Sequence, residues 1–213
     1  MRKSVHRPRW LPARLGVAML SATLLMSLFA QTVAAADNMG RKWPVNDEYG
    51  YYYRIAWYID SAFPSSFKSR IYEGSIQWNI DTHLYFEKQT SSNLRTDMYV
   101  YYVTSLWPFD NFCAATQANG SSSQLTGATI RFPHVPCSST WYSGTGTPPS
   151  NTIDLLSAAV HEFGHAVELY HAYDPYARHS EAAMWPYIPT SPDTKRYITS
   201  WDRAGVHAMY PTR

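Results

Sequence analysis

The segment over residues 161–171, which reads HEFGHAVELYH, constrains the fold of this chain more than any other. A helix turns by about 100° per residue, so His161 and His165 lie one turn apart on the same face, with Glu162 beside them. Two imidazoles at this spacing with an adjacent carboxylate form the HExxH pattern of zinc sites. The composition of the chain would produce only about 0.01 accidental matches to this pattern. The spacing therefore points to metal chemistry rather than to helix packing.

The position of His171 requires the helix to break. It lies six residues beyond His165, and a continuous helix would rotate it by about 600°, about 240° away from the ligand face. Chains with this motif usually have glycine at the break, where a left-handed backbone costs least, but the corresponding residue here is Glu168. A non-glycine residue there costs on the order of 1–2 kcal/mol, which zinc ligation could offset. If the helix continues instead, Asp174 or His179 must complete the site.

Three histidines would leave the fourth position of one catalytic zinc ion to a water molecule. Glu162, which is not itself a ligand, could take a proton from this water as a general base and pass it to a leaving amine. No serine or cysteine nucleophile is then needed. The sequence predicts one catalytic residue, Glu162, and three metal ligands, His161, His165 and His171.

Residues 1–36 have the pattern of a secretory signal peptide. Five basic residues and no acidic one precede the apolar run over residues 15–30, and three alanines at 34–36 offer a cleavage site. The run is shorter than the roughly 20 residues that span a bilayer, so we expect no stable membrane insertion after cleavage. The sequence thus predicts a secreted, extracellular protein with one catalytic domain over residues 37–213.

Removal of this signal would change the charge of the chain. The full sequence has 18 basic and 16 acidic residues, and loss of five basic ones would leave 13 basic and 16 acidic. The formal charge would then be near −3 instead of +2. No basic patch remains that would indicate nucleic-acid binding.

The two cysteines, Cys113 and Cys137, are the only ones in the chain. Export to an oxidising compartment favours a disulfide between them. The closed loop of about 25 residues would contribute about 3.5 kcal/mol in the chain-entropy model.

Hydrophobic patterns predict an α+β domain with a twisted mixed sheet and three helices. Strands are expected over residues 51–59, 84–88, 98–104 and 128–132, with a short one over 112–117. Helices are expected over residues 65–79, from the cap Asp154 across the zinc motif, and from Thr199 or Ser200 to Pro211. The stretch over residues 138–151, rich in Ser, Thr, Gly and Pro, is expected to be a mobile loop.

Several further segments match one family of zinc peptidases. They are RKWP at residues 41–44, Trp78 followed by LYF at 84–86, SAAVHE at 157–162, AMWPY at 183–187 and ITSWD at 198–202. With the zinc motif, they resemble the catalytic domain of the matrixins, secreted peptidases of the metzincin clan. The resemblance implies a metzincin-like zincin domain with an active-site helix and a methionine turn.

By this resemblance, the three histidines are the zinc ligands, Glu162 is the base and Met184 is the hydrophobic floor beneath the metal. Tyr187 could shape the neighbouring pocket or assist the transition state, or it could be a packed aromatic residue. The family places acidic ligands for structural zinc and calcium before the active-site helix, but residues 111–153 contain no Asp or Glu. We therefore expect neither structural zinc nor calcium, and we expect His134 to be an ordinary loop histidine.

The sequence predicts a secreted zinc-dependent metalloendopeptidase that cleaves extracellular proteins through a zinc-bound water activated by Glu162. Its substrate, an extended peptide or protein, would lie along a sheet edge, and we expect the enzyme to be a monomer. Two alternatives stay open. One is a catalytically silent, secreted zinc-binding protein with the same fold. The other is a hydrolase of another zinc clan, with Glu181 as the third ligand.

Overall fold

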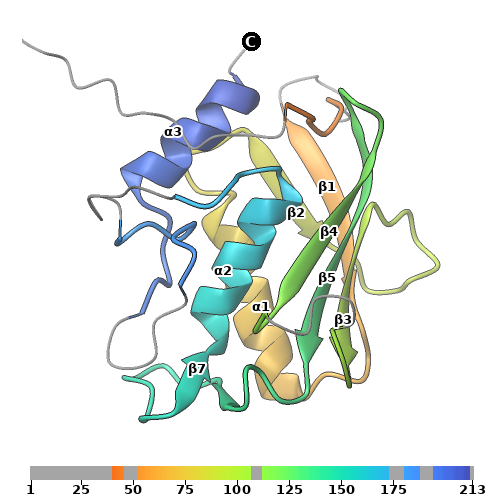
Figure 1. The fold of residues 1–213 in the computed structure, drawn as a ribbon. Coiled ribbons are helices and arrows are strands. Elements are labelled where there is room, and N and C mark those ends of the chain that lie inside the picture. The colour runs from red at the N-terminus through yellow and green to blue at the C-terminus, as the bar shows by residue number, and fades with distance from the viewer. Residues whose placement is uncertain (1–39, 46–51, 107–111, 173–179, 188–193, 212–213) are drawn as a thin grey trace, which may run out of the picture. The chain divides into compact units, whose positions relative to one another are not determined.

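The computed structural model describes residues 40–45, 52–106, 112–172, 180–187 and 194–211 (Figure 1). These residues all lie in the compact unit Val33–Arg213. The predicted signal peptide lies outside the described residues, as do Asp174 and His179. The elements are, in order, β1 (Tyr53–Ile59), α1 (Ser65–Gln77), β2 (Leu84–Lys88), β3 (Met98–Val103), β4 (Ala115–Gly120), β5 (Leu125–Pro133), β6 (Thr140–Tyr142), β7 (Thr152–Asp154), α2 (Leu155–Ala166) and α3 (Ser200–Met209).

A five-stranded mixed sheet has the strand order β2-β1-β3-β5-β4. Its first four strands pair in parallel, and β4 pairs antiparallel to β5 at one edge. The parallel pair β1 and β2 is joined through helix α1, the usual crossover between parallel strands. The predicted α+β fold with a mixed sheet and three helices is confirmed.

Helices α1 and α2 lie side by side against one face of this sheet (Figure 1). Their closest approach is at Gly74, where an added Cβ would lie 2.6 Å from the Cβ of Ala159. Beyond this crossing, the Trp78 side chain donates a hydrogen bond of 2.8 Å to the carbonyl of Val160. Phe163 of α2 packs edge-on against Trp57 of the sheet. These buried contacts fix α2 against both α1 and the sheet.

Two sequence predictions need correction. The short strand expected over residues 112–117 lies over Ala115–Gly120, because the chain before it is held by the Cys113–Cys137 disulfide. The disulfide itself is confirmed. The stretch over residues 138–151, expected to be a mobile loop, contains strand β6. It is anchored because the buried Trp141 donates a hydrogen bond to the Pro133 carbonyl, and Arg196 donates to the carbonyls of Thr145 and Gly146.

Within the described ranges, no helix is long and apolar enough to cross a membrane.

Candidate metal centre

Helix α2 begins where the sequence predicts. Asp154 is its N-cap, and its carboxylate accepts hydrogen bonds from the backbone N–H and the hydroxyl of Ser157 at 3.0 and 2.6 Å. The Arg196 guanidinium donates two further bonds to this buried carboxylate, of 3.0 and 2.6 Å. The first turn of the helix is therefore fixed before the first histidine.

Helix α2 ends at Ala166, and Glu168 adopts the left-handed conformation with φ 67°. The N–H of Glu168 donates to the His165 carbonyl at 2.9 Å, and the N–H of Leu169 donates to the Gly164 carbonyl at 3.1 Å. These two bonds form a Schellman motif, the usual helix end at glycine. The expected break at Glu168 is confirmed.

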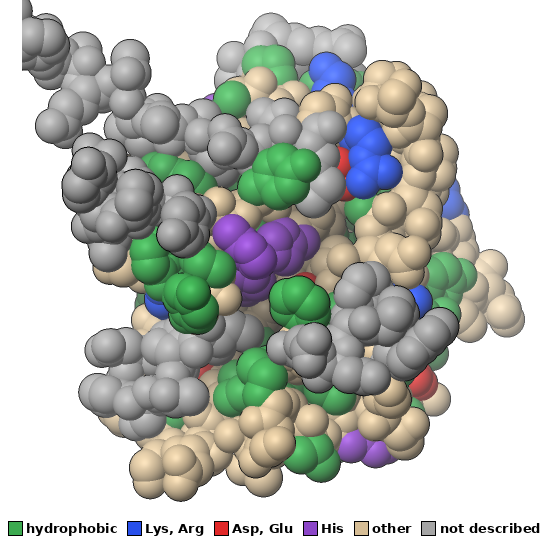
Figure 2. Space-filling model, viewed as in Figure 1, with side chains coloured by type: hydrophobic (Ala, Val, Ile, Leu, Met, Phe, Trp, Pro, Cys, Tyr) green, Lys and Arg blue, Asp and Glu red, His purple; other side chains and the backbone are tan. Residues whose placement is uncertain are grey.

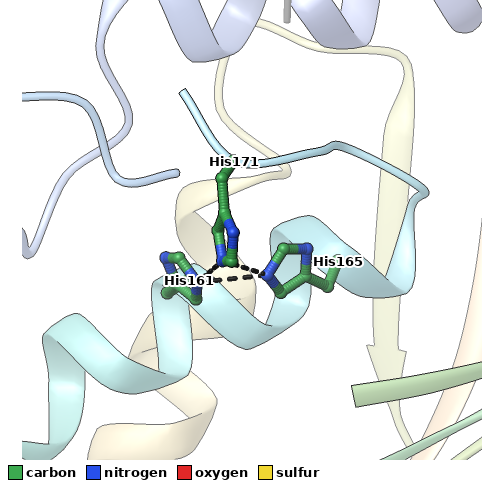
Figure 3. Close-up of side chains that lie close together, drawn as sticks. All are labelled: His161, His165 and His171. Atoms are coloured by element: carbon green, nitrogen blue, oxygen red, sulfur yellow. Dashed lines mark hydrogen bonds between the residues drawn. The ribbon is translucent and has the colours of Figure 1, made fainter. Parts of the chain in front are cut away.

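This break brings His171 back to the two helical histidines (Figure 3). The Nε2 atom of His171 lies 3.2 Å from that of His161 and 3.1 Å from that of His165, and the latter two are 3.1 Å apart. Neighbouring ligands of a tetrahedral ion with bonds of 2.0–2.1 Å are about 3.3 Å apart. The spacing of the three nitrogens therefore suits a zinc ion.

The hydrogen bonds on the far side of the rings also suit a metal. The Nδ1–H of His161 donates to the Ala183 carbonyl, and that of His165 donates to the Leu169 carbonyl, both at 2.8 Å. A neutral imidazole has a single N–H proton, which in both rings is on Nδ1. The Nε2 atoms therefore carry lone pairs, and these are turned toward each other. A bound cation would relieve this repulsion, and partners of this kind fix metal-ligating histidines.

All three histidines favour the neutral form that a metal ligand needs. Burial lowers the pKa of His161 well below its ordinary value of 6.5, and the neighbouring His165 lowers it further. Burial and the neighbouring His171 lower the pKa of His165 to about 4. Burial also lowers the pKa of His171.

Glu162 is buried beside the three histidines, and Thr116 of strand β4 holds its carboxylate. The Thr116 hydroxyl donates to Oε2 of Glu162 over 2.6 Å. Burial raises the pKa of Glu162 to about 7, although the Thr116 hydrogen bond opposes this shift. A carboxyl group with a pKa near neutral can both accept and return a proton, as a general base and acid must.

The methionine turn packs directly on helix α2. Met184 is fully buried, and an added Cβ on Gly164 would lie 2.2 Å from its sulfur atom. The buried Asp202 of helix α3 accepts hydrogen bonds from the backbone N–H groups of Ala183 and Met184 at 3.0 and 3.1 Å. The Ala183 carbonyl orients His161. By holding the methionine turn, Asp202 therefore supports the histidine cluster indirectly.

A cavity of about 480 Å³ opens over the histidines. Thr116 and the residues before it line one side, and Pro186 and Tyr187 line the other. Figure 2 shows the histidine side chains in a hollow bordered by hydrophobic side chains. Tyr187 lines this cavity and is 69% exposed, and its ring contacts that of Trp185 edge-on. Phe112 also lines the cavity and is exposed.

The structure brings together all four residues that the sequence singled out. Among the described residues, His161, His165 and His171 are the only group with the spacing of a metal site, and Glu181 is not part of it. His134 packs against the ring of Tyr102, as a loop histidine would.

Sequence reasoning missed the residues that hold this group from a distance, Thr116, Asp202 and Arg41. Thr116 lies opposite Ile130 of β5 and so points to the buried face of the sheet. This inward-facing position in the alternation of the strand was the only feature of the sequence that could have identified Thr116. Arg41 lies in the RKWP segment that resembles the family, but no pattern in the sequence indicates that its guanidinium binds the Glu168 carboxylate.

Comparison with known families gives one match. The family model of the matrixins covers residues 42–211. No curated protein sequence matches the chain. Because the family model spans most of the sequence, from the first buried tryptophan to the end of the last helix, the chain belongs to the matrixin family.

Proposed function

We propose that this matrixin is a secreted zinc-dependent endopeptidase that hydrolyses peptide bonds of extracellular proteins, with Glu162 as the general base. The family supports zinc metallopeptidase activity. The observation that carries the proposal is the convergence of three neutral imidazoles and one buried carboxylate on a single cavity.

In this proposal, His161, His165 and His171 hold the metal. When bound, zinc would supply a Lewis acid that polarises the scissile carbonyl and acidifies water. Glu162 would accept the proton of the attacking water and return it to the leaving amine. Thr116 would hold the carboxylate in the orientation that this transfer needs.

Strand β4 supports an extended substrate. It is an edge strand of the sheet, and its first residues, Ala115 and Thr116, line the cavity beside Glu162. An extended peptide can pair with the backbone of such an edge and place one bond over the catalytic residues. The exposed rings of Phe112 and Tyr187 on either side favour uncharged, apolar substrate side chains.

The experiment that tests the proposal combines zinc content with digestion of casein. The wild-type protein should bind one zinc per chain and digest casein. Glu162→Ala should keep the zinc and lose digestion, whereas His171→Ala should lose both. Glu181→Ala is the matched control, since this exposed glutamate lies outside the histidine group, and it should change neither.

Two other results would favour the silent binding protein or the hydrolase of another zinc clan. A wild-type protein that binds zinc and digests nothing would be the silent binding protein. If Glu181→Ala releases zinc and His171→Ala does not, the protein uses the ligand set of another clan. Secretion is tested separately by sequencing the N-terminus of the exported protein, which should begin after Ala36.

A further inference from the structure

The carboxylate of Glu168 is buried beneath the metal-site turn and paired with a distant arginine. Arg41 donates from Nε to Oε2 at 2.8 Å and from Nη2 to Oε1 at 2.6 Å. The Glu168 side chain is 0% exposed and that of Arg41 is 23% exposed. The Glu168 hydrogen bond also raises the pKa of Arg41. The two residues are 127 positions apart, so this contact is purely tertiary.

Glu168 lies at the centre of the turn that presents two of the three histidines. Its neighbour Leu169 accepts the hydrogen bond that orients His165. His171 follows three residues after Glu168. Any change in the backbone of Glu168 therefore moves the Leu169 carbonyl and the His171 ring together.

The conformation of Glu168 depends on an outside partner. A left-handed backbone is strained for a residue with a side chain, and such strain persists only where the surroundings enforce it. A buried carboxylate without a cation is also strongly unfavourable. Without Arg41, both effects would drive the turn to open until the carboxylate reaches water.

Arg41 reaches Glu168 from a segment that is fixed to the domain. The Trp43 indole donates to the carbonyl of Ala166, the last residue of α2, at 2.8 Å. Lys42 lies between Arg41 and Trp43, and its carbonyl accepts a hydrogen bond of 2.9 Å from the backbone N–H of Leu125 in strand β5. The chain directly after Arg41 is thus fixed at two points.

We propose that Arg41 is a positioning residue of the metal site. Its guanidinium holds the Glu168 carboxylate, and through it the turn that presents His165 and His171 to the metal. The inference rests on the zinc site of the proposed function and adds a residue that touches neither the metal nor the substrate.

The test is the rate at which a chromophoric chelator removes zinc from the full chain. Arg41→Ala should lose zinc at least about tenfold faster than wild type, the size of effect that such supporting contacts have on metal affinity. Glu168→Gly places a glycine in the left-handed position and leaves no carboxylate to pair. On this background, adding Arg41→Ala should change the rate by less than about twofold.

Arg54→Ala is the matched control, because it also removes an arginine from an ion pair, here the more exposed pair with Glu87 on the sheet. It should leave the rate within about twofold of wild type. Equal rates in wild type and Arg41→Ala would overturn the inference. The inference would also fail if Arg41→Ala accelerates zinc loss equally in the wild-type and in the Glu168→Gly background, since Arg41 would then act without Glu168.

If Arg41→Ala does not fold, the double variant decides. Folding and zinc retention equal to Glu168→Gly would support the inference, and failure to fold would overturn it. A wild-type protein that binds no zinc would instead refute the proposed function, which separates the two hypotheses.

Discussion

Helix α2 has a buried carboxylate just beyond each end and another in its middle, and their surroundings differ. At the ends, Asp154 and Glu168 are each bound by two nitrogens of an arginine from a distant segment. In the middle, Glu162 is held by the neutral hydroxyl of Thr116. Burial raises the pKa of this middle carboxylate to about 7.

The two end carboxylates bind arginine and hold the backbone at the ends of the helix, whereas the middle one lines the cavity beside the histidines. Burial disfavours the charged form of Glu162 and so raises its pKa. The two ends also differ from each other. The Asp154 end also has a local cap, in which the carboxylate binds Ser157, whereas the Glu168 end has a left-handed residue whose carboxylate binds Arg41.

The largest expected effect comes from the middle carboxylate. Glu162→Gln keeps the shape of the side chain and removes its proton chemistry. We expect casein digestion to fall by about 10²- to 10⁴-fold, the usual contribution of a general base. Zinc content should be unchanged. Digestion at the wild-type rate would mean that another group is the base.

The next effect should separate the two ends of the helix. Arg196→Ala leaves the buried carboxylate of Asp154 without its cation, and we expect the free energy of unfolding of the metal-free protein to fall by about 3–5 kcal/mol in urea. Unlike Arg41→Ala, it should not accelerate zinc loss from the folded protein, because the N-cap lies far from the turn of His171. Equal zinc loss in the two variants would show that the ends do not have distinct roles.

A smaller effect is expected where the helix middle meets the methionine turn. In Gly164→Ala, the new methyl group would overlap the Met184 sulfur and the Trp78 ring, at 2.2 and 2.7 Å. Overpacking of this kind costs about 1–3 kcal/mol, measured by urea unfolding. Gly127→Ala is the control, because its Cβ would meet only the Asp97 carbonyl, at 3.6 Å. A Gly164→Ala protein as stable as this control would show that the turn can move away from the helix.

Local sequence signals predicted the parts of this site that local interactions determine. The Asp154 cap and the HExxH face each involve residues within one or two turns of helix. The spacing of His171 required a break after His165, and the comparison with chains that have this motif placed it at Glu168. The α+β fold with three helices was predictable because the main strands and helices have clear hydrophobic periods, which are also local signals.

The rest depends on contacts between distant segments, which leave no periodic pattern. Arg41 and Glu168 are 127 residues apart, and Thr116 and Glu162 are 46 apart. Strand β6 was missed because its composition is that of a loop, and a buried side chain, Trp141, holds it in place. Sequence therefore predicted which four residues come together at the cavity, but not the residues that support them.

The smallest expected effect is a difference in pH dependence, measured by urea unfolding of the metal-free protein at pH 5 and 7. Burial lowers the pKa of all three histidines, so the unfolded chain binds protons below pH 6.5 that the folded protein does not. Stability therefore falls on acidification. Glu162 has the opposite effect on stability, because its pKa rises from 4.5 to about 7 on folding. Its contribution to the free energy of unfolding is present at low pH and is lost as the pH rises through 7. Glu162→Gln removes that opposition, so its stability should fall more steeply, by up to about 1.4 kcal/mol per pH unit. Parallel pH profiles would mean that Glu162 does not gain a proton on folding of the metal-free protein.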